Sequence, residues 1–273
     1  MMLQAVPSYL RSHGTLSLRF EQRAGGTTLR RRQEGGCLRV RVPRGPAVEA
    51  VVINTSGGLC GGDSIDQRIE WHDDTAALLT TQAAEKVYGS AGPACTVATR
   101  LDVGPRARAE WLPQETILFD GARLERTTDI ALAEDAALLW CESVVFGRLA
   151  RGEQCATGLL RDRVRVRRGG ALVYAEVLAL GDTPAALLDR PTLGNGARAC
   201  AVLLAIGGDT PTRLDAVRAG LEDHPDVLAG ASAWNGILAV RLLARDPPAL
   251  RRCLAASLKL LRGRPDLPGL WRC

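Results

Sequence analysis

The sequence predicts a mainly β protein whose strands stack in a β-solenoid-like or two-layer arrangement, with two α-helices near the C-terminus. Residues 14–180 form short segments in which apolar and polar residues alternate, such as LRVRV at 38–42 and ALVYAE at 171–176. Glycine, proline and aspartate separate these segments. Alternation with a period of two is typical of strands that bury one face, and the separating residues favour turns.

Turn signals recur at an interval of about 30 residues, which is a spacing found in repeated β-units. They fall at residues 72–75, 103–106, 132–135 and 168–170. An apolar strand with a polar residue follows each one: Gln82, then Gln114 and Glu115, then Glu142, then Glu176. The spacing predicts stacked hairpins, arranged either as a solenoid or as two sheets packed face to face.

The last quarter of the chain changes to the helical period. Residues 212–221 place Leu214, Val217 and Leu221 on one helical face, and residues 231–243 return to a strand pattern. Residues 247–262 predict a second helix, because two prolines precede a row of leucines at 250, 254, 258 and 261. No Ser/Gly-rich linker occurs, so we expect one domain over residues 1–273, with a β body at about 8–205 and a helix-containing part at about 206–273.

Composition excludes several classes of protein. Hydrophobic residues make up 46% of the 273 residues and charged residues 24%, which is an ordinary globular balance. The net charge is +5, but aromatic residues are only 4%, too few for the stacking surfaces of a nucleic-acid-binding protein. Arginine alternates with valine over 163–167, which favours a strand with one solvated face. An acidic protein partner for these arginines stays open.

The cysteines and histidines indicate a cytoplasmic protein without a structural metal site. The eight cysteines include no C-x-x-C pair, and the three histidines are too few for a histidine-rich metal store. The first residues lack the basic and apolar regions of a signal peptide, and no apolar run approaches the roughly 20 residues of a membrane span. We therefore expect reduced cysteines that pack in the core.

Candidate site residues lie in glycine-rich and polar runs. The segment NTSGGLCGGD at 54–63 lacks the lysine and hydroxyl residue of a phosphate-binding loop, so a wide turn is the plainer interpretation. The polar residues Thr80, Thr81, Gln82 and Lys86 could line a polar groove or form a solvated strand edge. Paired carboxylates of a hydrolase are another alternative, but no G-x-S-x-G or H-E-x-x-H motif accompanies the acids at 63, 115, 142 and 176.

Five stretches together resemble the urease accessory protein family UreD, also called UreH. They are GGLCGGD (57–63), LLTTQAAEKVYGS (78–90), WLPQETILFDGARL (111–124), FGRLARGE (146–153) and LPGLW (267–271). Their order and their coverage of most of the chain make the combination specific. Two residues depart from the family pattern: Cys60 stands where valine is usual, and Glu85 where a small polar residue is common.

The resemblance implies a β-rich, non-catalytic protein that takes part in urease maturation. It implies binding to UreF, through it to the GTPase UreG, and to the urease apoprotein, to which the assembly delivers Ni²⁺. It implies no tightly bound cofactor, only transient Ni²⁺, and a polar internal tunnel as the route. A dimer of this chain within the accessory complex is one arrangement that it allows.

A protein that delivers nickel has to release it, which favours oxygen ligands and water over thiolates. We therefore predict that Asp63, Glu142 and Glu176 contact the metal. The polar lining is predicted to comprise Thr81, Gln82, Lys86, Glu115 and Arg148. Buried acids require a wet channel or arginine partners, and Arg148 is such a partner by its proximity in sequence. A structural adaptor that never carries metal, or a hydrolase with paired carboxylates, are the alternative functions.

Overall fold

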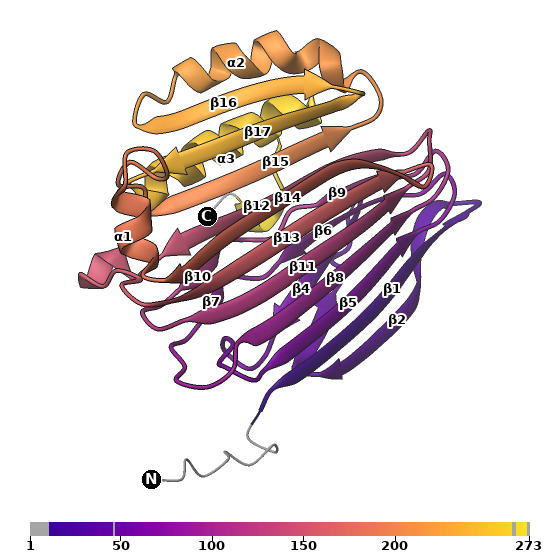
Figure 1. Ribbon diagram of the computed structural model, residues 1–273. Helices are drawn as coiled ribbons and strands as arrows, with labels where there is room; N and C mark the ends of the chain where they lie inside the picture. Colours follow the sequence, from indigo (N-terminus) through magenta and orange to yellow (C-terminus); the bar gives the residue numbers. More distant parts are fainter. Residues whose placement is uncertain (1–10, 46, 264–265, 272–273) are drawn as a thin grey trace.

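The strands form two sheets that pack face to face, with the two longer helices outside the second sheet (Figure 1). This computed structural model describes residues 11–45, 47–263 and 266–271. The first sheet has seven strands, in the order β14 (Ala171–Asp182), β13 (Gly158–Arg168), β11 (Arg123–Leu132), β8 (Cys95–Val103), β5 (Ser64–Trp71), β1 (His13–Arg23) and β2 (Gly26–Gly36).

The second sheet has ten strands. Its main path runs β16 (Val227–Trp234), β17 (Ile237–Ala244), β15 (Ala199–Ile206), β12 (Ala137–Phe146), β9 (Arg108–Trp111), β6 (Ala76–Thr81), β4 (Val48–Asn54) and β3 (Leu38–Arg41). Two short strands complete it beside β12: β10 (Thr116–Leu118) and β7 (Glu85–Val87).

The chain winds between the sheets as a β-solenoid of about four turns, which confirms the predicted fold class. Each turn gives one strand to each sheet: β4 and β5, β6 and β8, β9 and β11, β12 and β13. Successive turns pair in parallel within both sheets. Both alternatives from the sequence therefore hold, because the interior of this solenoid is itself a two-layer sandwich.

The repeated turn signals turn out to have two different structures. The first three join a strand of the first sheet to the next strand of the second, so they are corners of the solenoid rather than hairpin turns. The fourth, at 168–170, is a true hairpin between antiparallel β13 and β14. Glycine and aspartate suit both kinds of turn, so the sequence does not separate them.

The corners stack on one another. Asp74 and Arg106 have positive φ angles of 59° and 55°, and the Asp74 backbone N–H donates to Pro105. The Arg106 guanidinium donates two hydrogen bonds, of 2.6 and 2.8 Å, to the Asp74 carboxylate. Its backbone N–H donates to Asp135 in the following corner, at 3.1 Å. Neighbouring turns are thereby held in register.

Both predicted C-terminal helices are present, as α2 (Leu214–Glu222) and α3 (Pro247–Arg262). A short helix that the sequence did not reveal, α1 (Pro184–Asp189), follows β14. Single turns of 3-10 helix form at η2 (Leu149–Arg151), η3 (Thr210–Arg213) and η4 (Gly269–Trp271). No helix in the described ranges is long and apolar enough to cross a membrane.

The predicted strand at 231–243 is instead a hairpin of β16 and β17. Asn235 and Gly236 form its turn with positive φ angles of 47° and 74°. An Asn-Gly pair is the preferred sequence for such tight turns, because both residues tolerate left-handed backbone. This dipeptide was the signal that the strand interpretation overlooked.

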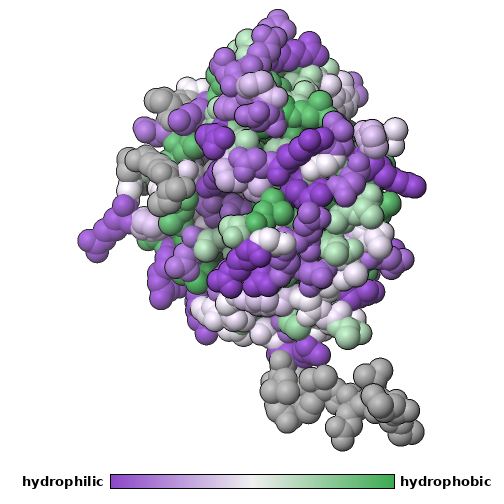
Figure 2. All heavy atoms as spheres, turned by 90° about the vertical axis from the view of Figure 1, so that its left-hand side faces the viewer, coloured by the Kyte–Doolittle hydropathy of each residue, from purple (hydrophilic) through white to green (hydrophobic). Residues whose placement is uncertain are grey.

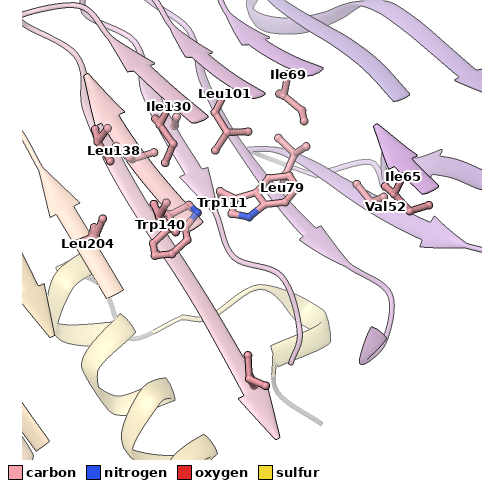
Figure 3. Packing of buried hydrophobic residues seen from close by; sticks show 14 of the residues in the cluster. Val52, Ile65, Ile69, Leu79, Leu101, Trp111, Ile130, Leu138, Trp140 and Leu204 are labelled. Carbon is pink, nitrogen blue, oxygen red and sulfur yellow. The ribbon is translucent and has the colours of Figure 1, made fainter. Parts of the chain in front are cut away.

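Two hydrophobic cores share the second sheet as their common wall. The larger fills the space between the sheets, where Trp111 and Trp140 of adjacent strands face Leu101 and Ile130 of the first sheet (Figure 3). The smaller lies between the second sheet and helices α2 and α3. The C-terminal LPGLW stretch closes it, since the Trp271 indole N–H donates to the Leu112 carbonyl at 3.0 Å.

Candidate functional site

Two cavities lie between the sheets and share two wall residues, Arg126 and Glu142. The first cavity, about 190 Å³, extends under the glycine loop at 57–58 and along β6, β7 and β8. The second cavity, about 210 Å³, lies among β12, β13, β14, β15 and β17. Because the same two side chains stand in both walls, the cavities adjoin there, and we call the two spaces together the interrupted path between the sheets.

The two shared residues, Arg126 and Glu142, form a cluster with Asp162 of the second cavity, and we call these three side chains the arginine junction. Arg126 Nη1 lies 2.6 Å from Glu142 Oε2, and Arg126 Nε and Nη2 lie 3.0 and 2.5 Å from the Asp162 oxygens. The three side chains are only 6%, 10% and 10% exposed. Arg126 therefore crosses from the first sheet to the second and binds an acid in each.

Strand alternation directs these side chains inward. Arg126 shares the inner face of β11 with Leu124, Thr128 and Ile130, all of them buried. Asp162 is its direct neighbour on the parallel strand β13. The remaining polar atoms at the junction come from the second sheet. Arg126 donates to Thr116 Oγ1 at 3.1 Å, and the Trp111 indole N–H donates to Glu142 Oε1 at 3.2 Å.

Burial and charge act in opposite directions on the junction. Burial raises the pKa of Glu142, and the guanidinium of Arg126 opposes that rise. Burial also acts to lower the pKa of Arg126, but the two carboxylates outweigh it and hold the pKa above its ordinary value. Arg126 therefore stays charged and compensates two acids, which leaves the junction with one more carboxylate than cations when both acids are ionised.

The first cavity has amide and hydroxyl groups in its wall beside apolar side chains. Gln67 donates to Thr99 Oγ1 at 3.3 Å across two strands of the first sheet. Glu85 opposes them from β7 and accepts hydrogen bonds of 3.2 and 3.0 Å from the Asn54 side-chain amide. Burial raises the pKa of Glu85, and the hydrogen bonds only partly counteract this. Glu85 is thus a desolvated carboxylate without an arginine partner among the described residues.

The glycine loop covers the first cavity because its backbone packs closely on β7. Gly57 and Gly58 adopt φ angles of 78° and 143°, and a Cβ at Gly58 would lie 2.6 Å from the Tyr88 ring. The Tyr88 hydroxyl donates to the Gly57 carbonyl at 3.0 Å. Asp63 fixes the end of the loop by accepting from the Ser12 and Cys60 backbone N–H groups at 2.8 and 2.7 Å.

The second cavity combines an apolar wall with one polar cluster. Glu176 accepts from the Tyr174 hydroxyl and from Arg241 Nη2, the latter at 2.7 Å. The indole N–H of Trp140, in the wall, has no hydrogen-bond partner among the described residues. Because a buried polar group without a partner is costly, this N–H favours a wet cavity.

The predicted site residues fall into two groups. Five line the cavities: Thr81, Gln82 and Lys86 the first, Glu176 the second, and Glu142 both. The other three, Asp63, Glu115 and Arg148, line neither. Glu115 lies 3.7 Å from Arg251 Nη1. Whether any of these residues contacts a metal stays a prediction.

Arg148 is not the partner of Glu142, contrary to the expectation from the sequence. Its Nε donates to Glu153 at 3.0 Å, and its guanidinium lies 4.4 Å from the centre of the Phe119 ring. Arg126 takes the expected role. Sequence reasoning missed Arg126 and Asp162, although each is a charge on the apolar face of an alternating strand. Such a misplaced charge is the signal that could have found them.

Within the described residues, no group of three or more His, Cys, Asp or Glu side chains is placed to hold a metal ion. The acids along the path are separated: Glu85 in the first cavity, the arginine junction between the cavities, and Glu176 in the second. A divalent cation on this path would therefore meet one or two carboxylates at a time, a chemistry of weak contacts.

Fold and cavities together define a β-solenoid protein with an interrupted polar path between its sheets. The model of the UreD urease accessory protein family matches residues 12–272 of the chain. The chain is 47% identical to the urease accessory protein UreD of Methylobacterium sp. (strain 4-46), over 97% of this chain and 96% of that protein. It is 42% identical to UreD of Azorhizobium caulinodans, over 98% and 99% of the two chains. The chain belongs to the UreD family of urease accessory proteins, which supports a role in urease maturation.

Proposed function

We propose that this chain is a non-catalytic scaffold of urease maturation, and that nickel passes between its two sheets to the urease apoprotein. The observation that carries the proposal is the meeting of two cavities at the arginine junction. Family membership provides the biological setting, and the cavities provide a path with oxygen-bearing walls. The partners are UreF, the GTPase UreG bound through UreF, and the urease apoprotein, in the cytoplasm.

The lining chemistry suits transit rather than storage. Glu142 and Glu176 offer carboxylate oxygens at successive positions, and Gln82 and Thr81 add neutral oxygens in the first cavity. Nickel binds thiolates and imidazoles more tightly than these groups, so such ligands would slow its release. Thr81, Gln82 and Lys86 form the polar lining in this proposal, and Asp63 contributes by holding the loop over the first cavity.

The arginine junction is the point of the path where a bound positive charge, that of Arg126, opposes the passage of a metal cation. The guanidinium of Arg126 already occupies the space between Glu142 and Asp162 and binds both, so a divalent cation has to replace it there. Exchange of one cation for another keeps the acids compensated throughout, whereas passage beside an unmoved arginine would be opposed by like charge.

Nickel loading of urease in cells tests the proposal. Thr99→Leu should narrow the first cavity and remove a hydroxyl from its wall, while Thr96→Leu changes an exposed position of the same strand. We expect the Thr99 variant to lower the nickel content of co-expressed urease, measured by elemental analysis, with its association with the partner proteins unchanged. The Thr96 variant should load nickel normally.

Normal metallation with Thr99→Leu and with Glu142→Gln, both still assembled with urease, would favour the structural adaptor that carries no metal. Turnover of a substrate by the purified chain, abolished by Glu142→Gln, would favour the hydrolase. Glu142 and Asp162 are the carboxylates that Arg126 brings together, so they are the pair that this alternative would require.

A further inference from the structure

The two sheets end at different places, and this leaves one end of the sandwich open (Figure 1). After the last solenoid turn, the first sheet gains one strand, β14, whereas the second sheet gains three, β15, β17 and β16. Helices α2 and α3 pack on the far side of these three strands. β17 faces β14, because its Ile237 and Ala239 are buried in the larger core and its Arg241 bonds Glu176. The opposite side of β16 therefore extends past the edge of the first sheet.

Apolar side chains are exposed around this open end. Eight large hydrophobic residues of the described chain are more than one-third exposed, and four of them lie on β14 or β16. On β14 these are Leu172 and Val177, exposed by 54% and 58%, on the outer face of the first sheet. On β16 they are Leu228 and Trp234, exposed by 65% and 36%, on the side away from the helices. On the side shown in Figure 2, by contrast, hydrophilic residues predominate and hydrophobic ones form small groups.

A row of arginines lies beside the exposed edge. The outward residues of β13 are Arg161, Arg163, Arg165 and Arg167, which alternate with buried residues. Arg165 pairs with Asp129 at 2.7 Å and Arg161 lies 3.6 Å from Glu125.

The other two arginines of the row have only neutral neighbours across the sheet. Thr127 and Val177 flank Arg163, and Ala131 and Leu172 flank Arg167. Neither arginine forms an ion pair with a described residue. The edge thus combines an exposed apolar strand with uncompensated positive charge.

We propose that the open end binds an extended acidic segment of another protein, which adds as a strand to the free edge of β14. An added strand would lie about 4.8 Å from β14, because that is the spacing of strands in a sheet. Its side chains would alternate: acidic residues on the outer side, toward Arg163 and Arg167 across Val177 and Leu172 of β14, and apolar residues on the inner side over β16. This inference does not depend on the passage of nickel.

Charge argues for another protein as the occupant. Pairing of β14 with β14 of a second copy would bring two arginine rows toward each other in a chain whose net charge is already +5. A single-stranded nucleic acid would need stacking residues, and Trp234 is the one exposed aromatic on β14 and β16, within the described residues. An acidic strand with one apolar face would supply carboxylates for the arginines and would cover exposed apolar side chains.

Hydrogen exchange with peptide probes tests the proposal. We would incubate the full chain with a synthetic peptide that alternates glutamate and valine, or with the same peptide carrying lysine in place of glutamate. The glutamate peptide should protect amides of residues 171–182 from exchange, because the carbonyls of an added strand accept hydrogen bonds from the N–H groups at the free edge of β14. High salt should weaken this protection, because it screens the ion pairs. Protection by the lysine peptide to the same degree, or by neither, would overturn the proposal.

Charge reversal supplies the matched comparison. The Arg163→Glu/Arg167→Glu variant should bind the glutamate peptide about tenfold more weakly, since two ion pairs become repulsive. The control is Arg30→Glu/Arg31→Glu, with the same charge change on β2, the opposite edge strand of the first sheet. Equal loss in both variants would mean a non-specific charge effect and would count against the site.

Two further measurements address the other occupants. Concentration-dependent dimerisation that Arg163→Glu/Arg167→Glu strengthens would identify β14 as a self-association edge and overturn the proposal. Binding of single-stranded RNA that protects β14 better than the glutamate peptide would also overturn it. Absence of both, together with protection by the glutamate peptide, supports an acidic partner strand.

Discussion

The interior of the sandwich contains two regions that are equally buried but physically opposite. At one level, Leu101 and Ile130 of the first sheet face Trp140 of the second within the hydrophobic core (Figure 3). At another level of the same strands stands the arginine junction. β11 supplies Ile130 to the first region and Arg126 to the second, with exposures of 3% and 6%. The apolar region stabilises the fold, whereas the junction has to be compensated internally.

This comparison teaches that burial alone does not define the core of this protein. A charged network between sheets is rarely the most stable way to fill such a space, because apolar residues of similar size often do as well or better. Stability alone therefore does not explain why this network stands between the two cavities. The following changes break or sharpen the contrast, beginning with the largest expected effect.

Removal of the junction cation should have the largest effect. Arg126→Met leaves Glu142 and Asp162 buried without a positive partner, which we expect to lower the free energy of unfolding by about 3–5 kcal/mol at neutral pH. Urea unfolding measures this. The triple variant Arg126→Met/Glu142→Gln/Asp162→Asn removes the unpaired charges and should regain most of the loss. An equal loss of unfolding free energy in both variants would show that packing, rather than unpaired charge, causes the destabilisation.

Truncation of a side chain in the apolar region should destabilise the protein without changing its delivery of nickel. Leu101→Ala removes a fully buried side chain, and we expect a loss of about 3 kcal/mol, the middle of the usual range. Nickel content per folded urease complex should match the unmodified protein at a temperature where the variant remains folded. A specific loss of nickel delivery would contradict the separation of the two regions.

Asp63→Ala should have a smaller effect, because it removes two hydrogen bonds at the end of the glycine loop. We expect a loss of about 2 kcal/mol, with faster amide exchange at residues 57–63. Asp66→Ala, at an exposed position of the adjacent strand β5, is the matched control. If Asp63 is also a metal contact, as the sequence predicted, urease should lose nickel even under conditions where the loop stays ordered.

Glu85→Gln should have the smallest effect, and of opposite sign. Burial raises the pKa of Glu85 in the folded state above its unfolded value of 4.5, so folding takes up protons. The unmodified protein therefore loses stability as pH rises from the unfolded pKa through the folded one. The glutamine variant lacks this loss, so it should be more stable at neutral pH and equally stable well below pH 4.5. Urea midpoints across pH would show this; a pH-independent difference would contradict it.

Several features were predictable because they depend on local pattern. Alternation marked the strands, and the proline pair and leucine row defined the bounds of α3 to the residue. The five stretches together indicated the family, and contacts in the structure explain particular residues in two of them. GGLCGGD needs glycine where the loop packs on Tyr88, and LPGLW places Trp271 against Leu112.

By itself, then, the sequence determined the β-rich fold, the two C-terminal helices and the family, and it named five of the residues that line the cavities. Only the tertiary structure decided which charges meet. Arg126 binds acids 16 and 36 residues away because solenoid winding brings successive turns into parallel register. Sequence proximity favoured Arg148 for the same role, yet its side chain points to Glu153. The open end is likewise tertiary, since it arises from the unequal number of strands that the two sheets gain after the last turn.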